Sequence, residues 1–239
     1  MSPAEFLLAT VVVVVGTSLQ GAVGFGLGLV GSPFLLLIDA RLVPGPLLFA
    51  SLVLTLLLTH RERREIVFSD LKWCLSGRVV GVACGAGALA VVSARSMAVA
   101  FGILVIVSVW ISASGLKVAL GRKTLLAAGV VSGFTATTVS IGGPPIALLY
   151  QHQPGPRVRG TLSAYFVVGA ALSLVALHLV GRFGNAEMVR ALSLLPGVLI
   201  GLRLSRRVAR YLDGGHTRKV VLAVSAVAGI VVILKQVLR

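Results

Sequence analysis

The stretch GAVGFGLGLVGSP, residues 21–33, interrupts the first apolar run of the chain. This run extends over 3–38, and a single helix of about 36 residues would measure about 54 Å, nearly twice the roughly 30 Å hydrocarbon core of a bilayer. Five of the thirteen residues are glycine and the last is proline, a composition that weakens a helix through backbone entropy and a missing amide donor. The sequence therefore predicts a break here with a helix on each side.

A second break, GGPP at 142–145, interrupts the run over 124–151. A spacing of 112 positions relates the two breaks, and it pairs Gly21 with Gly133, Gly31 with Gly143 and Pro33 with Pro145. Later glycines recur at a spacing of 120: Gly77 with Gly197, and Gly81 with Gly201. We interpret the chain as two repeats, 1–120 and 121–239, each with one broken segment and three further helices. Chance matches among 28 glycines are the alternative.

The composition excludes a soluble protein. Hydrophobic residues make up 57% of the chain and charged residues 12%, and the mean hydropathy is +1.02, whereas soluble domains are about 45–50% apolar and about 25% charged. Further apolar runs occupy 44–60, 73–92, 97–117, 161–181, 187–205 and 217–237. Aromatic residues are only 6% and alternating segments are absent, which argues against a membrane β-barrel. We expect an all-α polytopic protein whose surroundings are the lipid bilayer.

Basic residues indicate how the broken segments cross the membrane. If each broken segment enters and leaves on the same side, Lys and Arg outside the spans divide 15 against 6; if each crosses once, they divide 11 against 10. Cytoplasmic loops retain basic residues, so the hairpin topology is favoured. It places the basic loops in the cytoplasm and both termini in the periplasm, in the inner membrane of a cell. The net charge of +15 then requires no nucleic-acid partner, although concentration of anions at a pore mouth is a second interpretation.

A hairpin followed by three crossings ends on the side opposite its start, so the second repeat is inverted relative to the first. Inverted repeats with interrupted helices at matching positions are typical of secondary transporters, whose binding site lies near the bilayer midplane. Irregular backbone at that depth must be buried in protein or line a wet cavity. We therefore expect both breaks to meet at a central cavity.

The breaks also offer helix ends that attract anions. If the second limb of the first hairpin begins at Ser32, then Pro33 occupies the first helical position and the amides of Phe34 and Leu35 are free to donate. The same arrangement after Pro145 frees the amides of Ile146 and Ala147. Two positive helix ends could then converge on one anion. The alternative is that these glycines and prolines only permit tight bends.

Polar side chains gather at the two breaks, and one cation lies within a span. Hydroxyl and amide groups suit an oxyanion, although Ser and Thr in membrane helices more often bond their own backbone. Arg78 is a functional candidate because intramembrane cations usually are, although its long side chain could instead extend to the membrane surface. The candidate substrate-binding residues are Gln20, Gly21, Gly24, Phe25, Gly26, Ser32, Arg78, Thr137, Thr138, Ser140, Gly142 and Gly143.

Several kinds of chemistry have no motif in this sequence. All seven carboxylates fall at termini or in loops, which disfavours transport coupled to an intramembrane carboxylate. There is no Walker A sequence and no HExxH or paired-acid pattern, so we expect neither an enzyme nor a cofactor or metal site. Small residues four apart predict close helix packing, either between the repeats or as a homodimer face: Gly77, Gly81 and Gly85, then Gly197, Gly201 and Ser205.

The motifs QGAVGFGLGLVGSPFLLL at 20–37 and GFTATTVSIGGPPIALL at 133–149 resemble those of the TauE/SafE family of sulfite and organosulfonate exporters, and the resemblance covers essentially the whole chain. It implies a transporter of a small sulfur-containing anion that is built from two repeats. Our primary expectation is export of such an anion, sulfite or an organosulfonate such as sulfoacetate, by alternating access. Import of a related anion such as thiosulfate or a carboxylate, and passive conduction of anions, are the alternatives. The second break has Thr137, Thr138 and Ser140 where the first has Phe25, Gly26 and Gly28, an asymmetry that we expect to affect selectivity.

Overall fold

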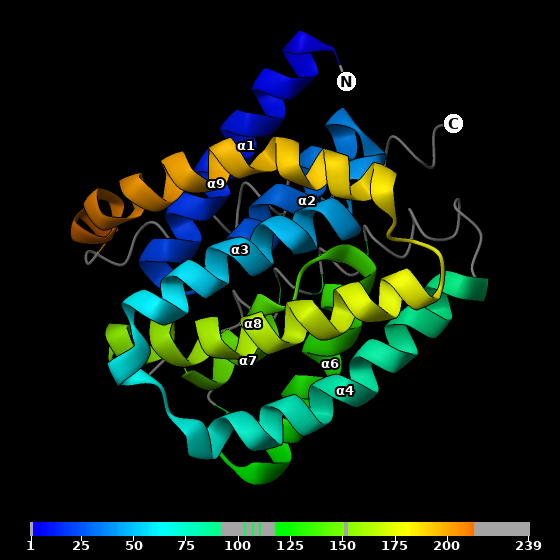
Figure 1. Ribbon diagram of the computed structural model, residues 1–239. Helices are drawn as coiled ribbons and strands as arrows, with labels where there is room; N and C mark the ends of the chain where they lie inside the picture. The colour runs from blue at the N-terminus through cyan, green and yellow to red at the C-terminus, as the bar shows by residue number, and fades with distance from the viewer. Residues whose placement is uncertain are drawn as a thin grey trace.

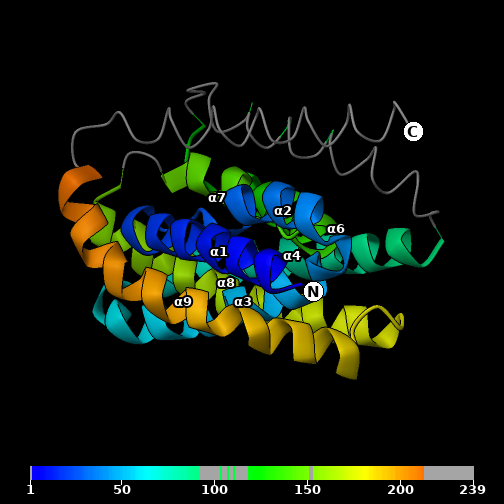
Figure 2. The ribbon, with the colours of Figure 1, turned by 90° about the horizontal axis from the view of Figure 1, so that it is seen from above.

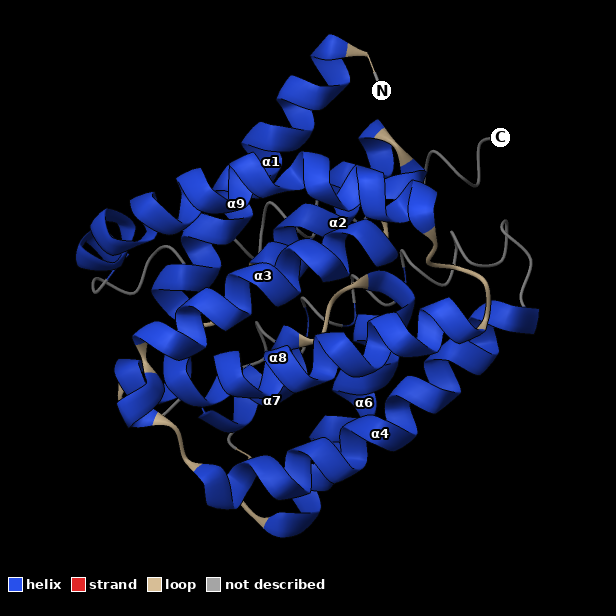
Figure 3. Ribbon diagram, in the orientation of Figure 1, coloured by secondary structure: helices blue, strands red, loops and turns tan. Residues whose placement is uncertain are grey.

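All regular structure in the described part of the chain is helical, which confirms the predicted class (Figure 3). The computed structural model describes residues 2–91, 118–150 and 153–212, together with positions 103, 107 and 110. The predicted runs at 97–117, apart from these three positions, and at 217–237 lie outside the described residues. The helices are α1 (Pro3–Val23), α2 (Leu27–Ile38), η1 (Ala40–Leu42), α3 (Gly45–Arg61), η2 (Arg63–Glu65), α4 (Phe68–Val91), α6 (Arg122–Val139), α7 (Gly143–Tyr150), α8 (Gly155–Leu179) and α9 (Asn185–Leu212).

The first break is three residues long and lies earlier than Ser32. Helix α1 ends where Gly24 adopts a left-handed conformation with φ of 101° and its amide bonds to the Gln20 carbonyl oxygen. Glycine is favoured there because a Cβ would be strained. Helix α2 then begins at Leu27, so Ser32 and Pro33 lie inside it. The prediction that the second limb begins at Ser32 is therefore wrong.

The second break has the same form at different residues. Helix α6 ends at Val139, Ser140 is left-handed with φ of 59°, and α7 begins at Gly143. Ser140 therefore corresponds to Gly24 and Gly142 to Gly26, at a spacing of 116 positions. The sequence suggested a spacing of 112, which is four residues, about one helical turn, shorter than the spacing between the equivalent helix ends.

Each broken segment returns to the end of the molecule at which it started. The first residues of α1 line a groove with Asp39 and Arg41, which directly follow α2. At the other hairpin, the Arg122 guanidinium at the start of α6 lies 5.4 Å from the centre of the Trp73 ring. The Tyr150 hydroxyl at the end of α7 donates a 2.9 Å hydrogen bond to the carboxylate of Asp70, near the start of the same helix as Trp73. Both broken segments thus form hairpins.

The helices form two bundles, each with its own apolar core. One core contains residues of α1, α2, η1, α3 and α9, and we name these helices the first bundle. The other core contains residues of α4, α6, α7 and α8, the second bundle. Helix α4 thus packs with the second half of the chain and α9 with the first, as Figures 1 and 2 show for α4 beside α6 and α9 beside α1.

Glycines allow these two exchanged helices to approach their partners closely. A Cβ at Gly77 or Gly81 of α4 would overlap the carbonyl groups of Leu126 or Val130 in α6. A Cβ at Gly201 of α9 would lie 2.6 Å from the carbonyl oxygen of Val14 in α1. The small-residue faces therefore pack inside the chain, between its two halves.

Four of these helices are long and apolar enough to cross a membrane: Pro3–Val23, Phe68–Val91, Gly155–Leu179 and the Asn185–Ala209 part of α9. Helices α2 and α3 are shorter apolar helices. Large apolar side chains such as Leu7, Leu8 and Val175 are exposed on their outer surfaces, as expected of residues that face lipid.

Replacement of Gly81 by alanine should destabilise the protein, because the added methyl group forces α4 away from α6 at a typical cost of about 1–3 kcal/mol. Gly87 lies on the same helix with nothing within 4 Å of an added Cβ, so Gly87→Ala should be neutral or should stabilise by up to about 1 kcal/mol. Thermal unfolding of the detergent-solubilised variants measures both effects. Equal melting temperatures for the two variants would contradict the close α4–α6 contact.

Candidate functional site

A small cavity lies where the two bundles meet at the breaks. Its volume is about 30 Å³, enough for only a few atoms. Both breaks contribute to its lining, together with α1, α3, α4, α6 and α8. The lining residues are Gln20, Phe25, Gly26, Gly28, Leu29, Leu48, Ser51, Arg78, Ala136, Ser140, Gly142, Gly143, Phe166 and Ala170.

Arg78 of α4 supplies the charge of this cavity. Its side chain is only 1% exposed, so it does not extend to the membrane surface. Its Nη1 donates a 3.2 Å hydrogen bond to Ser132 Oγ of α6, and its Cζ lies 4.7 Å from the centre of the Tyr165 ring of α8. No ion pair within the described ranges involves Arg78. Among the described residues, the groups found at this buried guanidinium are a hydroxyl and aromatic rings, an environment that favours an anion beside it.

Two neighbours fix the position of this guanidinium. Ser132 accepts from Arg78 and donates a 2.6 Å hydrogen bond to the carbonyl oxygen of Gly142, so Arg78 is connected to the second break. On the opposite side, Gly169 of α8 leaves the space that the guanidinium fills, because a Cβ there would overlap its Nε and Cζ atoms. The charge is therefore held between α6 and α8 at the edge of the cavity.

The first break presents a helix N-terminus to the cavity. Gln20 Oε1 accepts a 3.0 Å hydrogen bond from the Leu27 amide, so the side chain of Gln20 caps α2. The next two residues, Gly28 and Leu29, line the cavity, and their amides precede the first intrahelical hydrogen bond of α2, which Val30 donates to Gly26. The predicted donors Phe34 and Leu35 lie farther along α2 and do not line the cavity.

The second break contributes less. Helix α7 begins at Gly143, which lines the cavity, but Pro144 and Pro145 have no amide hydrogen. Of the first three positions of α7, only Gly143 can therefore donate. The predicted donors Ile146 and Ala147 belong to α7 but not to the cavity lining.

Seven of the twelve candidate residues line the cavity, and the other five do not. Gly21 packs against Ser205 of α9, and Gly24 packs against the backbone of Arg159 in α8. Thr137 and Thr138 donate to the carbonyl oxygens one turn earlier in α6, and Thr137 also shares a 2.9 Å hydrogen bond with Ser173. Ser32 donates a 2.6 Å hydrogen bond to the carbonyl oxygen of Val139, the last residue of α6, and so joins the two hairpins.

Sequence reasoning missed several residues around the cavity, including Ser132, Tyr165, Phe166 and Gly169. Each contacts Arg78 from another helix. No spacing along the chain marks such contacts, because they depend on how α4 packs against α6 and α8. The sequence offers one local signal for Ser132. Its neighbour Gly133 packs closely against the backbone of Arg78, so a glycine at 133 marks the part of α6 that approaches Arg78.

The arrangement is suited to a small oxyanion. The Arg78 guanidinium and the first residues of α2 line one polar space, and two aromatic residues, Phe25 and Phe166, form part of its wall. Ser140 also lines this space, but its hydroxyl donates a 3.0 Å hydrogen bond to the carbonyl oxygen of Pro44. Among the residues that the structure describes, there is no cluster of three or more side chains of the types that bind metal ions.

Comparison with known proteins agrees with this chemistry. The family model described as "Sulfite exporter TauE/SafE" matches residues 8–232, nearly the whole chain. No curated protein and no solved structure matches the chain. The family consists of membrane transporters rather than enzymes, and the apolar helices agree with an integral, multi-pass membrane protein. The chain therefore belongs to the TauE/SafE sulfite exporter family, whose members carry sulfur-containing anions across membranes.

Proposed function

We propose that this protein exports sulfite by alternating access, with Arg78 and the N-terminus of α2 as the principal ligands of the anion. The observation that carries the proposal is the buried Arg78 guanidinium at a polar cavity between two bundles. Ser140, Gly142 and Gly143 of the second break complete the site. Phe25 and Phe166 exclude water from the bound anion and so strengthen its attraction to Arg78.

The size of the cavity supports sulfite over a larger organosulfonate. The cavity is small, at about 30 Å³, so in this conformation a compact ion of four atoms requires less movement of the walls than the longer sulfoacetate does. Sulfite also presents three oxygens around one sulfur atom, which matches donors that converge from Arg78 and the N-terminus of α2. Export of sulfoacetate would require the cavity to enlarge.

The energetics support export without a coupling ion. In a cell with a negative interior, outward movement of one negative charge gains about 2.3 kcal/mol per 100 mV. Import of the same anion would require a coupled ion, and none of the described membrane spans places a carboxylate at the cavity. A passive channel would instead need a continuous pore. We regard this as the weaker alternative because two bulky side chains, Phe25 and Phe166, form part of the cavity wall.

We further propose that the two bundles arise from two inverted repeats, 1–120 and 121–239. Residues of the first repeat can be paired with residues of the second, at a spacing of 116 positions in the hairpins and 120 in the later helices. The paired residues then make equivalent contacts. A Cβ at Gly77 meets Leu126 while one at Gly197 meets Thr10, and one at Gly81 meets Val130 while one at Gly201 meets Val14. The positive-inside rule then assigns the end with Arg61, Arg122 and Arg206 to the cytoplasm and both termini to the periplasm of an inner membrane.

Sulfite efflux from proteoliposomes tests the function directly. Labelled sulfite inside vesicles should leave when a negative interior is imposed, without a pH or sodium gradient, and sulfoacetate should leave at least about tenfold more slowly because it exceeds the cavity. Vesicles without protein provide the baseline. Efflux that appears only after a proton gradient is added would overturn the uncoupled mechanism, and equal rates for both anions would overturn the size argument.

Arg78→Gln should abolish sulfite efflux while the protein remains folded, because the variant lacks the charge that binds the anion. Arg203→Gln is the matched control, since Arg203 is exposed on α9 and its replacement removes the same charge. Efflux and thermal stability should be measured on both variants. Efflux by Arg78→Gln at the wild-type rate would contradict the site.

Gly169→Ala should weaken sulfite binding although Arg78 is retained, because the methyl group displaces the guanidinium. We expect the KM for sulfite to rise about tenfold, the effect of one lost charge-assisted hydrogen bond. Ala171→Val, at an exposed position of α8, should leave KM unchanged. An unchanged KM in Gly169→Ala would show that the position of Arg78 is not important.

A further inference from the structure

Three charged side chains meet at the basic end of the molecule, outside the cavity. Arg61 Nε at the end of α3 donates a 3.1 Å hydrogen bond to Glu62 Oε1, and Arg159 Nε of α8 donates a 3.4 Å hydrogen bond to the same oxygen. Their side chains are 16% to 22% exposed, so water reaches them but does not surround them. One carboxylate is thus shared between two guanidiniums from different bundles.

This cluster lies directly against the first break. Arg61 Nη2 donates a 2.8 Å hydrogen bond to the Gly21 carbonyl oxygen, in the last turn of α1. A Cβ at Gly24 would lie 3.5 Å from Arg159 Cα, so the break packs on the backbone of Arg159. The next residues along the chain, Phe25 and Gly26, line the cavity. The three charged residues therefore lie next to the break, between the cavity and the basic end.

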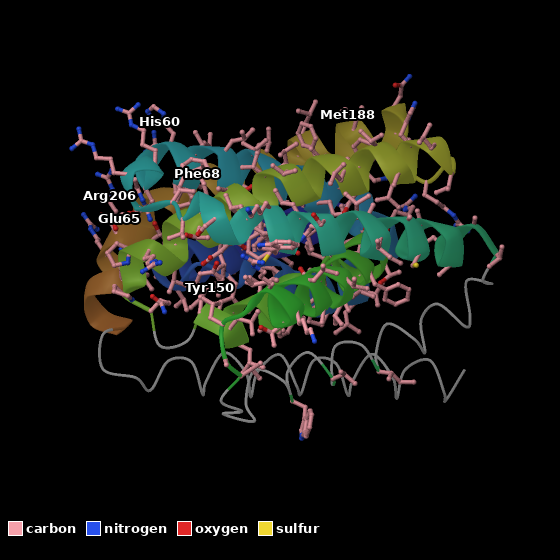
Figure 4. All side chains as sticks on the ribbon, turned by 90° about the horizontal axis from the view of Figure 1, so that it is seen from below. His60, Glu65, Phe68, Tyr150, Met188 and Arg206 are labelled. Atoms are coloured by element: carbon pink, nitrogen blue, oxygen red, sulfur yellow. The ribbon has the colours of Figure 1, made fainter. Side chains whose placement is uncertain are left out.

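The basic end attracts anions to this position. Figure 4 shows His60, Glu65 and Arg206 at this end, with Met188 at the opposite end. The exposed arginines around the cluster concentrate anions near the surface by their combined field. They are Arg63, Arg64, Arg206 and Arg207.

We propose that Arg61 and Arg159 form a second anion site, at the mouth of the transport path, which the carboxylate of Glu62 occupies in this structure. The substrate, a sulfur oxyanion, displaces Glu62 from the two guanidiniums before it moves past the first break to Arg78. The identity of this anion rests on the proposed function. Two guanidiniums around one carboxylate already provide the donors that a doubly charged oxyanion requires.

The geometry of Glu62 suits displacement better than a permanent structural bond. Only one of its oxygens accepts from the arginines, and the contact with Arg159 is long for a charge-assisted hydrogen bond. The backbone, by contrast, is held firmly, since a Cβ at Gly160 would lie 2.9 Å from the Glu62 carbonyl oxygen. The side chain can therefore leave without movement of the loop.

Equilibrium binding of labelled sulfite to the purified full-length protein, kept free of oxygen, tests the second site. The wild type should bind one sulfite per chain, at Arg78, and Glu62→Gln should bind two because the second site is then empty. The double variant Arg78→Gln and Glu62→Gln should bind one. Glu65→Gln, which removes the same charge from an exposed residue three positions away, should bind one, as the wild type does.

The outcomes separate the two proposals. If Glu62→Gln binds one sulfite and Arg78→Gln binds none, the second site is overturned and the proposed function stands. If Arg78→Gln loses no binding but Glu62→Gln gains one sulfite, the second site stands and the Arg78 site is overturned. Absence of binding by every variant overturns both.

A transport measurement provides an independent test if Glu62→Gln fails to fold. Arg159→Gln should raise the KM for sulfite supplied at the basic end about tenfold and leave the maximal rate unchanged, because the second site only collects the anion. Sulfite supplied at the opposite end should show no change in KM. A reduced maximal rate or melting temperature with an unchanged KM would show that the cluster is structural and would overturn the proposal.

Discussion

A buried guanidinium is the constraint on which the site depends. Transfer of an arginine from water into a protein interior costs several kcal/mol even after relaxation, and a carboxylate would be the usual partner. The structure instead surrounds Arg78 with a hydroxyl, two aromatic rings and a glycine that makes room for it. The charge is stabilised in part, and an anion in the cavity would stabilise it further. In the proposed function, this incomplete stabilisation of Arg78 by the described residues gives the site its affinity for the anion.

The two breaks serve this site in different ways. The first places Gly28 and Leu29, in the first turn of α2, at the cavity, and Gln20 caps the preceding amide of Leu27. The second has two prolines in its first turn and contributes the Gly142 carbonyl, through which Ser132 orients Arg78. In the proposed function, one break therefore binds the anion and the other positions the cation. The hydrogen bond from Ser32 to Val139 keeps the two breaks at a fixed distance in this conformation.

Composition and the runs of apolar residues were sufficient to predict the helical membrane class and the two hairpins, because the bilayer imposes length and charge rules on every span. The ends of the helices were harder to predict. Ser32 and Pro33 form a good local start signal, yet the chain turns at Gly24 and Gly26, where positive φ values need glycine. Arg78 was identifiable as a lone charge in a span, but Ser132, Tyr165 and Gly169 were not, since only the packing of helices brings them together.

The exchange of α4 and α9 between bundles affects how the chain can be assembled during synthesis. The core of the first bundle includes Leu194 and Val198 of α9, so α1, α2 and α3 cannot complete that core until most of the chain has been made. Helix α4 likewise must wait for α6 before its glycine face is covered. The early helices are therefore expected to associate only loosely until α9 has been made, so that the first bundle gains its full core late in synthesis.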